Sequence, residues 1–179
     1  LVLLDGFQFE VATFRTEGDY RDGRRPAEVK YSKNEVEDVI RRDFTINGLL
    51  YDPLEEVLFD HVEGEKDLED GIVRTIGNAY ERFEEDRLRM IRAVRFAARF
   101  SFDIEKESLS AIKEMSPTIT EVSKERIRDE ILKIITQANP GNGVVESAIF
   151  LLGGCSIPVP FNTGKNRINE LLKIEKVRF

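Results

Sequence analysis

One stretch, RFEEDRLRMIRAVRFAARF at residues 82–100, constrains the fold of this chain more than any other. At ~3.6 residues per helical turn, its small and apolar residues gather on one arc, which is typical of an amphipathic helix with one buried side. The opposite arc carries four arginines, Arg89, Arg92, Arg95 and Arg99. Guanidinium groups at this spacing repel one another, so the pattern calls for solvent, for carboxylates or for a bound polyanion.

An acidic group precedes these arginines, and Asp86 lies three residues before Arg89. A carboxylate beside a guanidinium offers an acceptor next to a fork of donors, which suits the reading of a nucleobase edge. Arginines further along the helix would then meet phosphates. On an arbitrary helix, the same residues are more often a first-turn acid paired with the next arginine on a solvated face. The pattern alone leaves both interpretations open.

Composition limits the class of protein. The chain has 179 residues, enough for one domain or two small ones with a real core. Its net charge of −7 argues against indiscriminate binding of nucleic acid, although a local basic strip can still hold a polyanion. No apolar run approaches the ~20 residues of a membrane span, so we expect no membrane partner and a cytoplasmic location. The oligomeric state stays open.

Cysteine and histidine are scarce. Cys155 is the single cysteine and His61 the single histidine, so an intramolecular disulfide is impossible. The same scarcity argues against a zinc site built from these residue types and against a Cys–His nucleophilic pair. The sequence therefore predicts no such metal site.

The first residues are predicted to form strands. An Asp-Gly pair at positions 5–6 is a strong signal for a two-residue hairpin turn, between strands expected at Leu1–Leu4 and Phe7–Arg15. Glu10 lies on one face of the second strand. It is either a solvated edge charge or a functional carboxylate, and the pattern favours the former.

A polar loop is expected at Thr16–Pro26, either as an ordinary surface loop or as a segment whose three arginines close over a ligand. A helix is expected at Ser32–Arg42, with Ser32 and Glu35 as a capping box. The sequence RRD at positions 41–43 follows at the junction with the next strand. Two arginines and an aspartate at such a junction point toward an anion or sugar hydroxyls.

After this junction the pattern changes from strands to helices at about Val62, an order that indicates an α+β fold. Strands are expected at Leu49–Tyr51, Val57–Val62 and Ile72–Ile76, an acidic linker at Gly64–Asp70, and helices at Ile104–Met115, Lys124–Gln137, Val144–Leu152 and Arg167–Val177. Ser123 is the expected cap of the helix at 124–137. Its apolar face is expected to carry Ile127, Ile131, Leu132 and Ile135.

Three blocks, RRDFTINGLLYDP at 41–53, DLEDGIVRTIGNAYERFEEDRLRMIRAVRFAARFSF at 67–102 and SKERIRDEILKII at 123–135, together resemble the class II tRNA nucleotidyltransferases. This family comprises bacterial CCA-adding enzymes and poly(A) polymerases. FEVATFRTEGDYRDGRRP at 9–26 also looks like the strand and loop of this family. The resemblance implies part of a polymerase-beta-like head with a mixed β-sheet at 1–62, a nucleotide-selecting helical neck at 63–115, and an RNA-binding helical body, incomplete, at 116–179.

The resemblance also implies roles for matching residues. Asp86 and Arg89 of the EDxxR motif would act as an amino-acid template that selects A or C and rejects G and U. The amino donors of A and C suit an Asp acceptor beside an Arg donor. Arg92 and Arg95 would contact the bound nucleotide. Arg42 and Asp43 would face the triphosphate and the ribose, where a contact to the 2′-hydroxyl would favour ribonucleotides.

One departure from the family is the missing Gly-Gly turn and DxD pair that hold two Mg²⁺ ions in the family's catalytic site. The resemblance places that segment before Phe7, so we expect no DxD metal ligands and no assigned catalytic residue in this chain. Glu10 is a weak candidate for a third, strand-borne carboxylate. We therefore expect the longer protein to use Mg²⁺, and this chain alone to bind nucleotide weakly without chemistry.

The leading interpretation is thus a fragment of a template-independent enzyme that adds C and A to tRNA 3′ ends, with ATP and CTP as substrates and tRNA or another RNA 3′ end as partner. Alternatives within the class are a poly(A) polymerase and an A-adding or CC-adding enzyme. Outside the class, the chain would be a non-catalytic RNA-binding helical module whose arginines follow phosphates, or a structural helical domain that binds no nucleotide.

Overall fold

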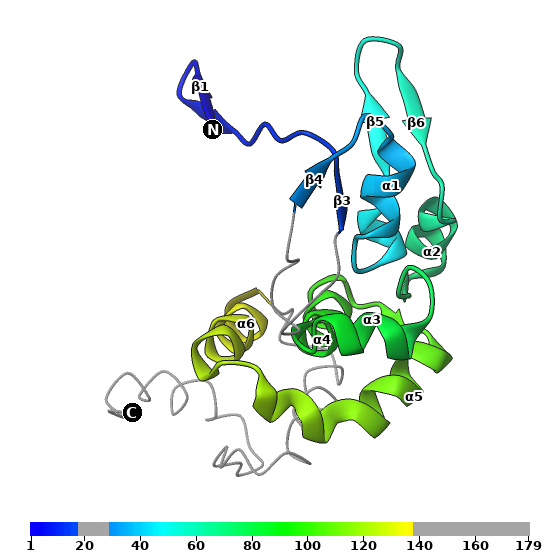
Figure 1. The fold of residues 1–179 in the computed structure, drawn as a ribbon, viewed down its shortest axis with the longest axis vertical. Coiled ribbons are helices and arrows are strands. Elements are labelled where there is room, and N and C mark those ends of the chain that lie inside the picture. Colours follow the sequence, from blue (N-terminus) through cyan, green and yellow to red (C-terminus); the bar gives the residue numbers. More distant parts are fainter. Residues whose placement is uncertain (18–28, 138–179) are drawn as a thin grey trace.

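The structure is a computed structural model, and it describes residues 1–17 and 29–137. Within these residues small paired strands precede a group of helices, so the predicted α+β class is confirmed (Figure 1). The helices expected at 144–152 and 167–177 lie outside the described residues, as does most of the loop expected at 16–26.

The chain begins with the predicted hairpin. Strands β1 (Val2–Leu4) and β2 (Phe7–Phe9) pair antiparallel. The turn residues Asp5 and Gly6 have φ angles of 51° and 83°. Positive φ at both positions is the geometry that an Asp-Gly hairpin turn requires.

The continuous strand predicted at 7–15 is wrong. The strand β2 ends at Phe9, and a separate strand, β3 (Arg15–Glu17), pairs antiparallel with β4 (Val29–Tyr31). Each short strand exists only where it has a hydrogen-bonded neighbour, and residues 10–14 between them belong to no strand. Alternating sequence alone cannot show that the neighbour changes within the run.

The helix predicted at 32–42 is shorter, with α1 at Glu35–Ile40, and its expected capping box is wrong. Asn34 caps the helix, since its side chain accepts a hydrogen bond from the backbone N–H of Val36 at 2.9 Å. Ser32 lies too far upstream for that contact and instead donates its hydroxyl to Glu37 at 2.5 Å.

A short 3₁₀ turn, η1 (Thr45–Asn47), leads to the antiparallel strands β5 (Leu50–Asp52) and β6 (Val57–Phe59). The acidic linker predicted next is wrong, because residues 64–70 form helix α2 (Gly64–Asp70). The Asp60 carboxylate accepts hydrogen bonds from the backbone N–H groups of Gly64 and Glu65, which satisfies donors of the first turn.

The single helix predicted at 82–100 is wrong. It consists of α3 (Ala79–Glu85) and α4 (Leu88–Phe100), separated at Asp86 and Arg87. The backbone of Asp86 is extended, with φ −145° and ψ 103°, and its side chain accepts a hydrogen bond from the N–H of Leu88 at 3.1 Å. Such local bonding by an aspartate favours a turn over a continuous helix.

The remaining elements are helical except for one parallel pair of strands, β7 (Ile72–Val73) and β8 (Asp103–Ile104). Helix α5 (Lys106–Met115) is followed by the 3₁₀ segment η2 (Ser116–Glu121) and by α6 (Lys124–Gln137). The predicted Ser123 cap is wrong, because its buried hydroxyl makes no hydrogen bond.

The core surrounds α4. Its apolar arc is buried as predicted, from Met90 through Ala98. In α6 the prediction for Leu132 is wrong, since that side chain is 48% exposed and Ile134 lies in the core instead. Ile134 follows Ile127 by seven residues, two helical turns, so both face α4.

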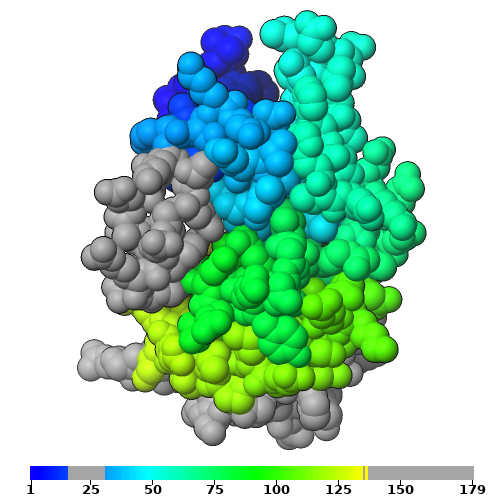
Figure 2. Space-filling view, turned by 45° about the vertical axis from the view of Figure 1, so that its right-hand side comes forward, coloured from blue at the N-terminus to red at the C-terminus, as the bar shows by residue number. Residues whose placement is uncertain are grey.

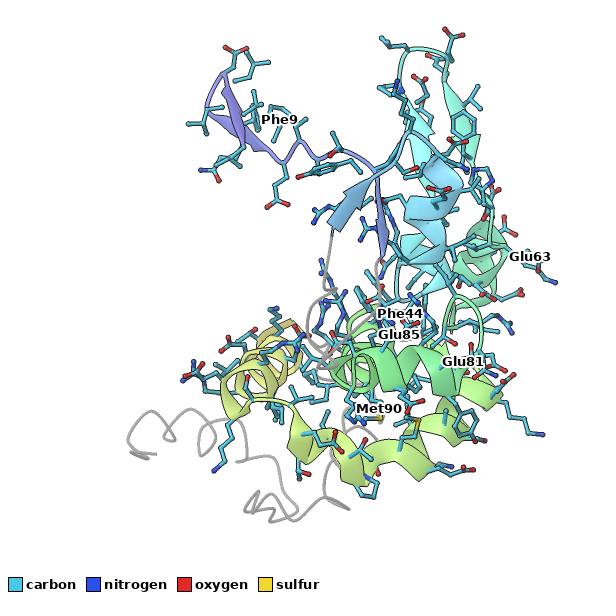
Figure 3. All side chains as sticks on the ribbon, viewed as in Figure 1. Phe9, Phe44, Glu63, Glu81, Glu85 and Met90 are labelled. Atoms are coloured by element: carbon cyan, nitrogen blue, oxygen red, sulfur yellow. The ribbon has the colours of Figure 1, made fainter. Side chains whose placement is uncertain are left out.

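The N-terminal residues reach into this core through Phe44, which is fully buried and packs edge-to-face on Phe96 of α4 with ring centroids 5.7 Å apart. In Figure 3 the labels of Phe44 and Glu85 mark the region where the N-terminal residues meet α3 and α4, and Met90 lies further toward α5. On the face shown in Figure 2, residues of α3 and α4 lie between the N-terminal residues and the later helices. Residues 41–44 therefore contact the arginine-rich helix directly.

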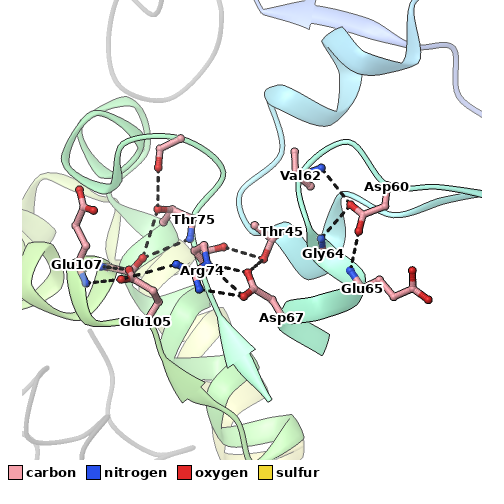
Figure 4. Close-up of polar contacts among 12 residues, drawn as sticks. Thr45, Asp60, Val62, Gly64, Glu65, Asp67, Arg74, Thr75, Glu105 and Glu107 are labelled. Carbon is pink, nitrogen blue, oxygen red and sulfur yellow. Dashed lines mark hydrogen bonds and ion pairs between the residues drawn. The ribbon is translucent and has the colours of Figure 1, made fainter. Parts of the chain in front are cut away.

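A second connection involves Asp67 of α2 (Figure 4). Its buried carboxylate accepts hydrogen bonds from the hydroxyl of Thr45 at 2.7 Å and from Nε of Arg74 at 2.9 Å. Arg74 also lies 4.0 Å from Glu105. These contacts hold α2 against η1 and, through Arg74, near the start of α5.

Candidate functional site

The four arginines on one arc of α4, here called the arginine stripe, are Arg89, Arg92, Arg95 and Arg99. The stripe contacts the RRD sequence through Asp43. The Oδ2 atom of Asp43 accepts hydrogen bonds from Nε of Arg92 at 2.7 Å and forms an ion pair with its Nη2 at 2.5 Å. The Oδ1 atom accepts from the backbone N–H of Phe44 and from the side chain of Asn47. Asp43 is only 8% exposed, so this pair fixes the junction between residues 41–47 and α4.

Arg42 is held on the other side by Asp38 of α1. Its Nε and Nη2 atoms donate to Oδ2 of Asp38 at 3.2 and 2.9 Å, and its Nη1 atom donates to the carbonyl of Asn47 at 2.8 Å. Burial raises the pKa of Asp38, but hydrogen bonds from Arg41, from the backbone of Arg15 and from Arg42 outweigh it and lower the pKa overall. Asp38 therefore stays ionised and holds the guanidinium groups of Arg41 and Arg42 in place.

A third contact joins α3 to the same block. The Nη2 atom of Arg82 donates to the carbonyls of Arg41 and Arg42 at 2.6 and 2.7 Å, and its Nη1 atom donates to Glu85 at 2.6 Å. Arg89 donates to the same oxygen of Glu85 at 2.5 Å and to the carbonyl of Arg82 at 2.9 Å. One carboxylate thus orients both guanidinium groups.

Asp86 lies at the break between α3 and α4, one turn before Arg89. The backbone N–H of Arg89 donates to its carbonyl at 3.0 Å, but its carboxylate forms an ion pair with Arg126 of α6, Nη2 to Oδ2, at 2.9 Å. The template pair of the sequence prediction is therefore close along the chain, with each side chain engaged by a different partner.

Arg95 forms a buried ion pair with Glu130 of α6, with 2.7 Å between Nε and Oε2. Lys133 donates to the other oxygen of Glu130 at 2.7 Å. Burial raises the pKa of Glu130, but the hydrogen bond from Lys133 and the charges of Arg95, Lys133 and Arg92 lower it overall. Arg99, at the end of the stripe, lies over the ring of Phe100, 5.3 Å from its centroid.

The sequence-predicted residues fall into two groups. Arg42, Asp43, Arg89 and Arg92 lie around one junction, whereas Asp86 and Arg95 face α6. Glu10 is exposed and lies after the end of β2, so its predicted place within a strand is wrong. Sequence reasoning missed Asp38, Arg82, Arg126 and Glu130 as partners. Asp38 had a signal, because it precedes Arg41 and Arg42 by three and four residues on a helix.

Within the described residues, 1–17 and 29–137, no group of three or more His, Cys, Asp or Glu side chains is arranged to hold a metal ion. These residues do not fit the two-metal site implied by the resemblance. In the same part of the chain no helix is both long and apolar enough to cross a membrane.

Two family models match this chain. One, described as the poly A polymerase head domain, covers residues 2–74, and one, described as a probable RNA and SrmB-binding site of polymerase A, covers residues 101–146. The first therefore ends just before the helices that carry the arginine stripe.

Two relatives of similar sequence are both named CCA-adding enzyme. The chain is 45% identical over 144 residues to the CCA-adding enzyme of Enterococcus faecalis, covering 80% of this chain and 35% of that protein. It is 44% identical over 164 residues to the CCA-adding enzyme of Lactobacillus johnsonii, covering 92% of this chain and 40% of that one. The chain thus spans between a third and two fifths of the length of these relatives.

Solved structures of CCA-adding enzymes have a similar fold. The fold matches the Bacillus stearothermophilus CCA-adding enzyme in complex with CTP, with a TM-score of 0.72 and 31% identity, over 87% of this chain and 36% of that one. It also matches apo form II of a CCA-adding enzyme, with a TM-score of 0.73 and 27% identity, over 91% of this chain and 39% of that one. From the ordered sequence blocks, the shared fold and these matches, the chain belongs to the family of CCA-adding enzymes and poly(A) polymerases.

Proposed function

We propose that this chain is the nucleotide-selecting part of an RNA 3′-end nucleotidyltransferase that adds C and A to tRNA 3′ ends, with CTP and ATP as substrates. The observation that carries the proposal is the Asp43–Arg92 pair, 2.7 Å between Oδ2 and Nε. It joins the RRD sequence to the arginine stripe, so that one ribonucleoside triphosphate can span both. The names of the relatives and the CTP complex of a similar structure support the same substrate class.

At the base end, we assign selection to Asp86 and Arg89. The Asp86 carboxylate uses one oxygen for the N–H of Leu88 and one for Arg126, and a carboxylate has about four acceptor sites. Acceptor capacity therefore remains for the amino group of A or C. Uracil and guanine present a carbonyl at the corresponding position and would face this acceptor without a donor.

At the other end, we assign Arg42, Asp43, Arg92 and Arg95 to the ribose and phosphates. Arg42 and Arg92 have 31% and 33% of their side chains exposed, so an anion can reach both. Arg95 is only 8% exposed and is paired with Glu130, so a phosphate reaches it by sharing or displacing that carboxylate. The Asp43 carboxylate can accept from a ribose 2′-hydroxyl in exchange for one of the donors that it already holds, such as a guanidinium N–H of Arg92.

The chemical step belongs to the longer protein in this proposal. The Mg²⁺ expected for it has no matching ligand group among residues 1–17 and 29–137, so no step is assigned to these residues. RNA as partner is supported by the match of residues 101–146 to an RNA-binding family model.

The test is an extension assay with the longer protein that contains this chain, on tRNA lacking its terminal CCA, with each ribonucleotide alone and with CTP plus ATP. Addition of C, C and A followed by a stop is the expected result. An open-ended run of A would instead make the protein a poly(A) polymerase. No incorporation would favour an RNA-binding module without base selection.

Replacing the template carboxylate tests the base end. Asp86→Ala is expected to reduce discrimination against UTP and GTP by ~10- to 100-fold, the range for one good hydrogen-bonded base contact. Asp129→Ala is the matched control, because Asp129 is an exposed aspartate of α6 paired with Arg128. Single-nucleotide incorporation rates give the ratio. Unchanged discrimination with equal or tighter RNA binding would show that the arginines only follow phosphates.

A further inference from the structure

Asp38 is a buried carboxylate to which neither the sequence motifs nor the proposed nucleotide contacts assign a role. It is 2% exposed and lies in the last turn of α1. Its Oδ2 atom accepts from Nε and Nη2 of Arg42, and its Oδ1 atom accepts from Nε and Nη2 of Arg41. A single carboxylate therefore holds both arginines of the RRD sequence.

The same oxygen also fixes the neighbouring strand. Oδ1 of Asp38 accepts from the backbone N–H of Arg15 at 3.1 Å, and Nε of Arg41 donates to the carbonyl of Arg15 at 3.2 Å. The backbone N–H and the carbonyl of Arg15, the first residue of β3, are thus both hydrogen-bonded to side chains at the end of α1. The position of Asp38 is consequently tied to the backbone and is not free to follow its arginines.

The contacts leave part of Arg42 available. A guanidinium has five N–H groups, and the structure uses three of those of Arg42, two toward Asp38 and one toward the carbonyl of Asn47. The two others have no partner among the described residues. With 31% of the side chain exposed, these N–H groups can meet an anion while the opposite edge of the guanidinium stays held.

We propose that Asp38 is a positioning residue for the triphosphate end of the nucleotide site, which aims the two free N–H groups of Arg42 at the phosphates. This inference rests on the proposed function. In this proposal Asp38 sets phosphate affinity, and base choice belongs to Asp86 and Arg89. The contacts of these two residues include Arg126, Leu88, Glu85 and the carbonyls of Arg41 and Arg82.

The test is calorimetric titration of the full 179-residue chain with CTP, UTP and inorganic tripolyphosphate. Asp38→Asn keeps the shape of the side chain but places a donor against two guanidinium groups. It is expected to weaken binding of CTP and of tripolyphosphate by the same factor, ~10- to 100-fold, the range known for loss of a group that orients a metal-binding side chain. The CTP/UTP ratio is expected to stay unchanged.

Glu37→Gln is the matched control, since Glu37 lies on the same helix, is exposed, and contacts Ser32. It changes the net charge equally and is expected to leave all three affinities within twofold. If Asp38→Asn fails to fold by circular dichroism, Asp38→Glu replaces it, because the charge is kept while the carboxylate moves by one methylene.

The outcomes separate the two proposals. Wild-type chain that binds neither CTP nor tripolyphosphate would overturn the nucleotide site itself. Wild-type binding with equal or tighter tripolyphosphate binding by the Asp38 variant would overturn the positioning role alone. A fall in the CTP/UTP ratio along with affinity would also overturn it, because Asp38 would then act as a general structural support.

Discussion

Two arginines of α4, Arg92 and Arg95, are neutralised by carboxylates that lie far away in the chain, whereas Arg89 pairs with a carboxylate four residues before it. Asp43 reaches Arg92 over a separation of 49 residues, and Glu130 reaches Arg95 over 35. Asp86 and Arg126 are 40 residues apart. Mutual repulsion along α4 is therefore offset by tertiary contacts, and the fold of α6 onto α4 depends on these pairs as well as on apolar packing.

Removing one partner of the buried pair should destabilise the chain strongly. Glu130→Gln leaves Arg95 charged with only 8% of its side chain exposed, which is expected to cost about 3–5 kcal/mol of unfolding free energy. Urea denaturation measures this value. Asp129→Asn breaks an exposed pair with Arg128 and is expected to cost about 1 kcal/mol or less. Similar losses in both variants would contradict the importance of burial.

Among the elements, those determined by local chemistry could be predicted from the sequence. The Asp-Gly turn, helix α5 and helix α6 follow from turn geometry, apolar period and a proline stop, and all three are present near their expected places. The helix break at Asp86 was missed, because the apolar period continues on both sides and the cause is a single side-chain bond to Leu88.

The site itself was predictable only in part. The structure brings Arg42, Asp43, Arg89 and Arg92 around one junction, and their partners there depend on tertiary contacts. No periodicity places Arg126 beside Asp86 or Glu130 beside Arg95, since α6 reaches α4 only after three intervening elements. Long-range pairing of charges carries no local signal.

Helix α2 is an element whose stability should depend on pH. Burial raises the pKa of Asp60, but backbone hydrogen bonds from Glu65, Gly64 and Val62 outweigh it and lower the pKa below its ordinary value of 3.8. The unfolded chain then binds more protons than the folded one, so this stabilisation is complete above the ordinary pKa. It is lost as the pH falls through the folded-state value.

Asp60→Asn should flatten that dependence. The variant keeps an acceptor oxygen but cannot titrate, and it is expected to lose about 1 kcal/mol at about pH 7 and almost nothing at about pH 2. Urea unfolding as a function of pH measures the difference. Asp52→Asn serves as control, because Asp52 accepts backbone bonds from Leu54 in an exposed turn. An equal loss at both pH values would contradict the prediction.

At the scale of the whole molecule, Arg82 makes two of the hydrogen bonds that join residues 41–47 to the helices. Arg82→Met removes a donor from the partly buried carbonyls of Arg41 and Arg42. The loss is expected to cost about 1–3 kcal/mol in total, because the carbonyl of Arg41 keeps Nη2 of Arg89 at 3.4 Å. Hydrogen exchange should accelerate over residues 35–47 and stay slow over 88–98, where the core around α4 is independent of this contact.

Arg128→Met is the control for this exchange experiment, because Arg128 is 60% exposed and pairs only with its neighbour Asp129 among the described residues. It should leave both segments unchanged. Acceleration spread evenly over the two segments in the Arg82 variant would mean that they unfold as one unit.

Three arginines of the stripe have their counterions within the chain itself, as carboxylates. On a nucleic acid, mobile ions fill that role, and their release makes binding sensitive to salt. Here the neutralising carboxylates of Glu85, Asp43 and Glu130 are parts of the chain and stay behind when an anion arrives. A bound triphosphate and a carboxylate then trade or share one guanidinium. Such an exchange conserves the number of ion pairs, so geometric fit, more than ionic strength, decides which anion is retained.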